Sequence, residues 1–435
     1  MEAATGRRRS ANERADADGR MRFGRPTGFA RLWFGQAVSV AGTQITFLAL
    51  PMAAVIALHA TPAQMGLLGA LDNLPYLLFG LGVGLVVDRW RRRRLMILGD
   101  LVRAAAVGSV PLAAVAGRLT YEQLLAVVFV VGACNLLFDI ASQAQLPDLV
   151  AADQLVAANG KLELNRSLSM VGGPAVAGTL ITWLTAPIAI AVDALSYLVS
   201  ACSIASIRDP EPDRARSEEG ARSQIVDGLR LVAGDGRLVG IAGASAIISF
   251  AMNAIFAVLV YFLANERHMD AGAIGVLFTV FGLGGAAGAL LSPAIGRRLG
   301  VGRLLALAPV LAGVSVVGFT LAPSTGSPFG LDLATPVALL GAGMVAYGVT
   351  CAGVRQQLAP AAARGRVMGT LRFFEWGTMP LGSLAGGLMG QALGPGAALG
   401  MTAGAFILAG VWVAASPAAR LGRPATQGDA HPSPV

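Results

Sequence analysis

The sequence predicts an all-α membrane protein with twelve transmembrane helices arranged in two pseudo-symmetric six-helix bundles. Of the 435 residues, 55% are hydrophobic and 13% are charged, whereas a soluble domain carries about 25% charged residues. Twelve apolar segments approach the roughly 20 residues that a helix needs to cross a bilayer. The two halves of the chain also resemble each other at an offset of about 210 residues, as in transporters built from repeats.

The boundaries follow from the breaks between apolar segments. The expected spans are roughly 31–58, 64–87, 95–117, 120–145, 163–183, 186–206, 238–263, 271–294, 303–322, 334–356, 367–392 and 396–416. They define an N-terminal tail (1–30), a first bundle (31–206), a polar linker (207–237), a second bundle (238–416) and a C-terminal tail (417–435). The tail lacks the features of a cleaved signal peptide, and Met21 is an alternative start to Met1.

The distribution of arginine and lysine predicts the orientation. Eight basic residues lie in the segment up to Arg31, five lie between Asp88 and Arg94, and six arginines lie in the 207–237 linker. With twelve spans all of these fall on one face, and the opposite connections hold only Arg118 and Arg267. Because basic loops stay in the cytoplasm, we expect a multi-pass protein of the cell membrane with both termini cytoplasmic.

Several classes of function are excluded. The net charge of +8 is dispersed between apolar segments, so no nucleic-acid surface is expected. The three cysteines lie in apolar segments and the three histidines in loops or the tail, so neither a disulfide framework nor a metal site is predicted. The chain has no phosphate-binding loop for ATP. We expect neither an enzyme nor a bound cofactor.

One charged stretch separates the second and third spans. Gly84 is followed by Asp88, Arg89 and a further run of arginines that includes Arg92 and Arg93. A carboxylate beside arginines can form charge-assisted pairs that break when helices move, and Asp139 is a plausible second acceptor for Arg92 or Arg93. The alternative is a purely topological signal, which requires the arginines but neither acid.

These motifs resemble the major facilitator superfamily, in particular its drug-efflux and siderophore-export branch. The resemblance rests on Gly84-x-x-x-Asp88-Arg89-x-x-Arg92-Arg93, on Gln145-Leu-Pro-Asp-Leu-Val150, and on Gly173-Pro174 with Gly178, and it extends over residues 31–416. It implies that Asp88 lies against the start of helix 11 and that Gly84, Asp88, Arg89, Arg92, Arg93 and Asp139 form a latch of the outward-facing state. The motif around Gly173, Pro174 and Gly178 favours export.

Three acids lie deep in predicted spans: Asp72, Asp193 and Glu375. A charge at the centre of a span costs about 2.5–3.5 kcal/mol, and burial favours a protonated carboxyl group. Each acid is therefore a candidate proton carrier, with Asp72 ranked first because it has no local cation. The alternatives are that Glu375 neutralises Arg372 on the same helix face and that Asp193 bonds a neighbouring helix.

The resemblance also implies that helices 1, 4, 7 and 10 line the substrate cavity. Polar residues at helical spacing on these four spans are the candidates: Gln36, Gln44, Asn135, Ser245, Asn253, Tyr347 and Arg355. The alternative is polar contact between helices. The leading hypothesis is proton-coupled export of a hydrophobic or amphipathic small molecule by a monomer in the lipid bilayer. An importer, a siderophore or lipid carrier and a non-transporting sensor are the alternatives, and the substrate is left open.

Overall fold

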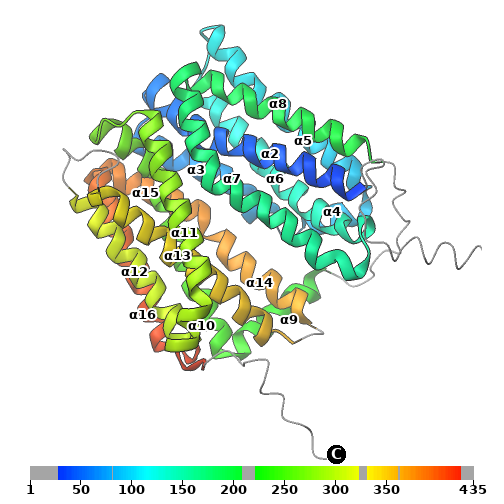
Figure 1. Ribbon diagram of the computed structural model, residues 1–435, viewed down its shortest axis with the longest axis vertical. Helices are drawn as coiled ribbons and strands as arrows, with labels where there is room; N and C mark the ends of the chain where they lie inside the picture. Colours follow the sequence, from blue (N-terminus) through cyan, green and yellow to red (C-terminus); the bar gives the residue numbers. More distant parts are fainter. Residues whose placement is uncertain (1–27, 81, 208–220, 323–330, 361–362, 423–435) are drawn as a thin grey trace, which may run out of the picture.

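A computed structural model describes residues 28–80, 82–207, 221–322, 331–360 and 363–422. In these residues the secondary structure is helical throughout, with short turns and no strand. The predicted all-α class is confirmed. The helices keep their labels in Figure 1.

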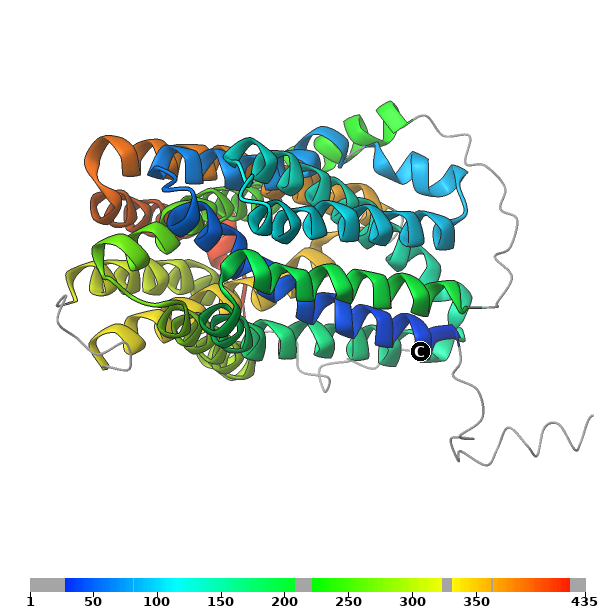
Figure 2. The same cartoon turned by 90° about the horizontal axis from the view of Figure 1, so that it is seen from above.

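The first bundle contains the helices of the N-terminal half. They are α2 (Gly28–Met52, continued by the π-helical turn Ala53–Ala57), α3 (Pro62–Phe79), α4 (Val83–Arg89), α5 (Arg92–Val115), α6 (Tyr121–Leu149), α7 (Leu155–Leu184) and α8 (Ala186–Ala205). Helix α8 packs on α2 and α5, and Figure 2 shows α2 and α8 running side by side. Helix α9 (Ala221–Gly234) lies within the linker predicted at 207–237.

The second bundle repeats the arrangement. Its helices are α10 (Gly236–Tyr261, continued by the π-helical turn Phe262–Glu266), α11 (Ala271–Leu299), α12 (Val301–Leu321), α13 (Leu331–Leu358), α14 (Arg364–Gly377), α15 (Met379–Leu393) and α16 (Pro395–Ala415). The side chain of Asp235 caps the start of α10 and binds the Arg237 guanidinium at 2.8 Å. This hydrogen bond lowers the pKa of the Asp235 carboxyl group.

Two of the twelve predicted spans are discontinuous. Ten helices in the described residues are long and apolar enough to cross a membrane singly. The predicted span 64–87 is divided into α3 and α4 between Gly80 and Gly82, and the span 367–392 into α14 and α15 at Gly377 and Thr378. Glycine is unfavourable in a helix interior, which is consistent with both breaks. Pro380 lies in the first turn of α15, where proline is tolerated.

Unusual backbone conformations recur at equivalent positions in the two halves of the chain. Two non-glycine residues with positive φ, His59 (53°) and His268 (52°), follow the π-helical turns of the two halves and stand 209 positions apart. Thr185 (74°) and Gly394 (90°), also 209 positions apart, join the last two spans of each half. Such conformations are uncommon for residues other than glycine. Their recurrence at one offset supports the predicted pseudo-symmetry of the two bundles.

The bundles meet at one face and diverge toward the other. For orientation, the terminal face is the one that holds Gly28, the α4–α5 turn and Leu421, and the opposite face holds the turns at His59, Thr185 and Gly394. Near the opposite face α3 packs on α15 and α7 packs on α11. Figure 1 shows the two bundles meeting beside α3 and α15 and separating toward α4 and α9.

Candidate substrate cavity

A cavity of about 630 Å³ lies between the two bundles. Residues from α2, α3, α6 and α8 line it on one side, and residues from α10, α11, α13, α14 and α15 on the other. It ends at close backbone contacts near the opposite face. There a Cβ atom on Gly66 of α3 would lie 2.7 Å from the Cα of Gly387 on α15. Only a residue without a side chain allows this approach, so the glycines close the cavity at that end.

Five of the seven predicted cavity residues line it: Asn135, Ser245, Asn253, Tyr347 and Arg355. Gln36 and Gln44 are not among the lining residues, and their placement in the cavity is wrong for this conformation. Gln44 packs against Gly173 of α7, where an added Cβ would meet its side chain at 2.5 Å. Helix α2 instead presents Thr43, Thr46 and Phe47 to the cavity.

The three predicted acids occupy different environments. Asp72 lines the cavity and is exposed within it, and no ion pair joins it to another described residue. Asp193 is fully buried behind the wall, where it accepts hydrogen bonds from the hydroxyl groups of Thr46, at a short distance, and Ser196, at 3.0 Å. The alternative that Asp193 bonds a neighbouring helix is confirmed, because Thr46 belongs to α2.

Glu375 forms an ion pair across the second bundle. Arg355 of α13 donates to the Glu375 carboxylate at 2.9 Å and to the Ser245 hydroxyl at 2.6 Å. The alternative that Glu375 neutralises Arg372 does not describe this conformation, in which the Arg372 guanidinium lies 5.5 Å from the Trp376 ring centroid. Arg355 and Glu375 both line the cavity, so the positive charge of Arg355 there is neutralised by the Glu375 carboxylate.

Aromatic side chains from both bundles meet in the cavity wall. The Phe47 ring of α2 lies 5.6 Å from the Phe256 ring of α10 and 5.7 Å from the Phe278 ring of α11, both edge-on. Phe256 and Phe278 stack at 6.2 Å. Nearby, Asn73 donates to the side-chain oxygen of Asn253 at 3.3 Å across the two bundles. The wall therefore combines apolar surface with a few polar groups, as small-molecule sites do.

Sequence reasoning missed a buried ion pair in α5. Asp100 is fully buried and Arg103 is 4% exposed, and they form a short salt bridge. Arg103 also donates to Asn135 at 2.8 Å, and its guanidinium group lies 4.5 Å from the ring centroids of both Phe138 and Tyr197. The available signal was the spacing of three residues between acid and base within an apolar segment, which places both on one helix face.

The predicted latch region lies at the terminal face. Arg92 is buried and binds the Asp148 carboxylate at 3.3 Å and the Ala144 carbonyl at 2.6 Å, while Arg93 donates to the carbonyls of Ile204 and Ala205. Asp148 belongs to the Gln145–Val150 motif, and it accepts from Arg92 where Asp139 was expected to do so. Asp139 is half-buried on α6 and has no ion pair in the described part of the chain.

The other latch residues are placed as follows. Arg89 is exposed at the end of α4, and a Cβ atom on Gly84 would have no neighbour within 4 Å. The side chain of Asp88 lies outside the described part of the structure, so its predicted contact with helix 11 stays a prediction. Helix α4 packs on α5 and α6 of its own bundle.

The helix-5 motif contributes to the contact between bundles. A Cβ atom on Gly275 of α11 would lie 2.3 Å from the Pro174 carbonyl oxygen, and one on Gly178 would lie 2.5 Å from the Ala271 carbonyl oxygen. Gly173 faces α2 of its own bundle, beside Gln44. Two of the three motif residues thus help to close the cavity at the opposite face.

Two six-helix bundles around a central cavity define a membrane transporter of the major facilitator type. The family model described as "Transmembrane secretion effector" matches residues 24–431, and the chain belongs to that family. The predicted membership and the expectation that the chain is not an enzyme are both confirmed by this match.

The chain is similar in sequence to known efflux proteins. The chain is 27% identical to multidrug efflux pump Tap of Mycolicibacterium fortuitum over 376 residues, which cover 83% of this chain and 88% of Tap. It is 31% identical to macrolide efflux protein A of Streptococcus pyogenes over 193 residues, or 43% of this chain, and thus spans about half (47%) of that relative.

A solved structure shares the fold. The inward-facing state of a bacterial homologue of the iron transporter ferroportin superimposes with a TM-score of 0.70 at 17% identity, covering 89% of this chain and 97% of that one. Its outward-facing state gives a TM-score of 0.57. The arrangement of the two bundles is therefore closer to the inward-facing state of that protein.

Proposed function

We propose that the protein exports a hydrophobic or amphipathic small molecule in exchange for protons, by alternating access. The observation that carries this proposal is the cavity of about 630 Å³ between two similar bundles, closed at the opposite face by glycine contacts. A drug-sized ligand fits a cavity of this size. The phenylalanines would contact its apolar part, and Asp72, Asn135 and Asn253 its polar groups.

We place the terminal face on the cytoplasmic side of the cell membrane. The excess of arginine at this face supports that orientation. The resemblance of the bundle arrangement to an inward-facing state supports it too. In this state the protein would take up its substrate from the cytoplasm or from the inner leaflet of the bilayer.

The cluster at the terminal face is the proposed latch. Helix α4 packs within its own bundle, and Gly84 has open space around it. When the bundles close at this face, Gly84 would allow close packing, and Asp88 would meet the start of α14 with Arg89, Arg92, Arg93 and Asp139 nearby. Arg92 already has an acceptor in Asp148, so the latch would form on a preorganised arginine.

The direction of transport is inferred from the relatives. Macrolide efflux protein A and multidrug efflux pump Tap are named as exporters, and the Gly173–Pro174 motif favours export. An importer, or a siderophore or lipid carrier of the same fold, is the alternative. The proton would be held by one of the predicted acids, Asp72, Asp193 or Glu375, and we expect a monomer to be sufficient.

The test is transport by the full chain in everted membrane vesicles from a bacterial strain without its own efflux pumps. Erythromycin and ethidium are the probes. We expect uptake of at least one of them when the vesicle interior is acidified, and loss of that uptake when an ionophore collapses the gradient. Asp72→Asn, Asp88→Asn and Asp139→Asn should weaken it. Efflux that is unchanged in all three variants and independent of the gradient would sink the coupling model.

A further inference from the structure

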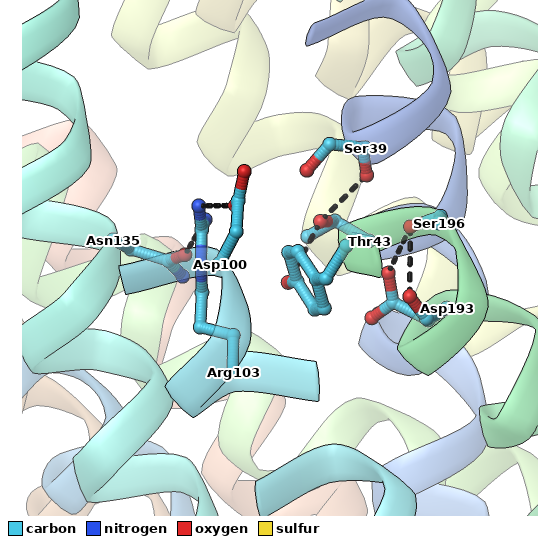
Figure 3. Close-up of polar contacts among 8 residues, drawn as sticks. Ser39, Thr43, Asp100, Arg103, Asn135, Asp193 and Ser196 are labelled. Atoms are coloured by element: carbon cyan, nitrogen blue, oxygen red, sulfur yellow. Dashed lines mark hydrogen bonds and ion pairs between the residues drawn. The ribbon is translucent and has the colours of Figure 1, made fainter. Parts of the chain in front are cut away.

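A group of buried polar side chains lies behind the cavity wall, inside the first bundle. Figure 3 shows it: Asp100 and Arg103 of α5 lie beside Asn135 of α6, and Asp193 of α8 lies beside Ser196. Asp100 and Asp193 are fully buried, and Arg103 is 4% exposed. We call Asp100, Arg103 and Asp193 the buried triad.

The charges of the buried triad do not balance. Arg103 is permanently protonated, and it forms its salt bridge with Asp100. Asp193 has two hydroxyl partners and no cation within ion-pair distance in the described residues. When both carboxyl groups are ionised, the triad carries one uncompensated negative charge in the membrane interior, which is strongly unfavourable. A single bound proton makes it neutral.

We propose that the buried triad is a one-proton site in which Asp193 holds the proton and Arg103, paired with Asp100, sets the number of protons bound. This inference rests on the proposed function and deepens it, because it assigns the coupling proton to a site behind the substrate cavity. Arg103 and Asp100 are positioning residues in this account, since neither exchanges the proton itself.

The surroundings of Asp193 fit a carboxyl group that alternates between two forms. The hydroxyl groups of Thr46 and Ser196 can donate to a carboxylate or accept from a carboxylic acid. Gly42 of α2 leaves room for the group, because a Cβ atom there would lie 2.6 Å from the Asp193 carboxylate. Thr46 also lines the cavity, so it connects Asp193 to the space that opens toward the terminal face.

Other titratable groups face the buried triad from the helices packed against it. Helix α6 contributes Cys134 and Asp139, and α8 contributes Tyr197, whose hydroxyl group lies 3.1 Å from that of Thr43. Helix α2 contributes hydroxyl groups to it; the ionisable residue in the described part of α2 is Arg31, which binds the Ser206 carbonyl at the terminal face instead. One oxygen of Asp100, the Arg103 Nε and the Ser200 hydroxyl are buried and have no hydrogen-bond partner among the described residues. Helix α7 contributes Arg166, which acts on Asp139. Among the described residues no second cation forms an ion pair with Asp100 or Asp193.

The charge count predicts a pattern that a purely structural role would not produce. Asp193→Asn leaves the Asp100–Arg103 salt bridge, and Asp100→Asn leaves Arg103 and Asp193 as opposite charges in one buried cluster. In both variants the remaining charges sum to zero without a proton. The double variant Asp100→Asn with Arg103→Gln removes both partners of the salt bridge and leaves Asp193 alone, so the proton is again required. One substitution thus abolishes proton binding, and a second at the same pair restores it.

The measurement is infrared difference spectroscopy of the purified full chain in lipid nanodiscs, titrated through neutral pH. We expect the carbonyl band of one protonated carboxyl group in the wild type, its loss in Asp193→Asn and in Asp100→Asn, and its return in the double variant. Asp72→Asn is the matched control, since it removes a cavity acid and should leave this band in place.

Three results would overturn the proposal: the band persisting in Asp193→Asn, equal bands in Asp100→Asn and wild type, or no band in the double variant. If a single variant does not fold, the double variant is compared with the triple variant Asp100→Asn, Arg103→Gln and Asp193→Asn. Equal spectra of these two variants would refute the site. These spectra require no substrate, so an absence of efflux would overturn the proposed function separately.

Discussion

The third and sixth helices of the two bundles occupy equivalent places but have different interiors. In the first bundle α5 and α8 bury Asp100, Arg103 and Asp193. In the second bundle the corresponding α12 and α16 bury apolar side chains, including Leu305, Ala312, Ala403 and Phe406. The one ionisable residue of α12 and α16 is Arg303, which is exposed near the start of α12.

This difference separates what the fold requires from what function adds. The second bundle shows that the same six-helix arrangement forms without charged side chains at these positions, where Ala312 and Thr402 are buried instead, so the buried charges are not needed for the architecture. A buried ion pair gives little net stability compared with well-packed apolar residues. On the proposed function the first bundle would retain these charges for proton coupling, whereas Arg355 and Glu375 of the second bundle line the cavity as an ion pair.

The largest expected effect comes from breaking the ion pair of the first bundle. Arg103→Leu leaves Asp100 buried without its cation and should destabilise the protein by about 3–5 kcal/mol. Replacing both partners by leucine should restore most of this loss, because it recreates the apolar packing of α12. Unfolding in detergent, followed by fluorescence against denaturant, measures the difference. Equal losses in the single and double variants would show that packing alone matters at this position.

An intermediate effect is expected where the two bundles touch. Gly66→Val places a side chain against the backbone of Gly387, and such overpacking costs about 1–3 kcal/mol. Because the contact exists while the opposite face is closed, the substitution should shift the population toward a state that is closed at the terminal face.

Spin labels report that shift as a distance. Labels at Val86 of α4 and Phe374 of α14, both exposed, should move closer in Gly66→Val when measured by double electron–electron resonance in a cysteine-free background. Gly404→Val is the matched control, since a Cβ atom there meets nothing within 4 Å. An unchanged distance in Gly66→Val would contradict the proposed alternating access, in which opening at one face accompanies closure at the other.

The smallest effect on stability is expected for the ion pair of the second bundle. The side chains of Arg355 and Glu375 are 14% and 31% exposed, so cavity water can solvate either charge when the other is removed. Glu375→Gln should cost less than about 2 kcal/mol. It should disfavour cationic compounds relative to neutral ones, because the Arg355 charge in the cavity is then uncompensated. Resistance profiles to ethidium and to a neutral drug test the change in compound preference. A loss of unfolding free energy as large as that in Arg103→Leu would contradict the difference between the two bundles.

Much of the architecture could be predicted from the sequence because bilayer physics constrains it strongly. Length and hydropathy predicted the spans. The family resemblance, which points to helices 1, 4, 7 and 10, together with helical spacing, found five of the seven candidate cavity residues. The rotation of α2 could not be predicted, since it depends on packing: Gly35 and Gly42 lie against α8, which turns Gln44 toward α7 and Thr43, Thr46 and Phe47 toward the cavity.

The charged partners were harder to predict, because spacing along a chain does not determine which helices face each other. Asp148 rather than Asp139 binds Arg92, and Arg355 rather than Arg372 binds Glu375. The pair of Asp100 and Arg103 stands two helical turns from an arginine-rich loop. In the sequence it resembles the end of that basic segment, whereas in the structure it is enclosed by the rings of Phe138 and Tyr197.

The central claim is that the first bundle carries the coupling proton. Its most direct test is erythromycin transport by the purified protein in liposomes, with and without an imposed pH gradient. We expect the gradient to accelerate wild-type transport at least tenfold, which corresponds to about 1.4 kcal/mol in the activation free energy. We expect Asp193→Asn to transport still but no longer to respond to the gradient. An equal response in Asp193→Asn and wild type would contradict the claim.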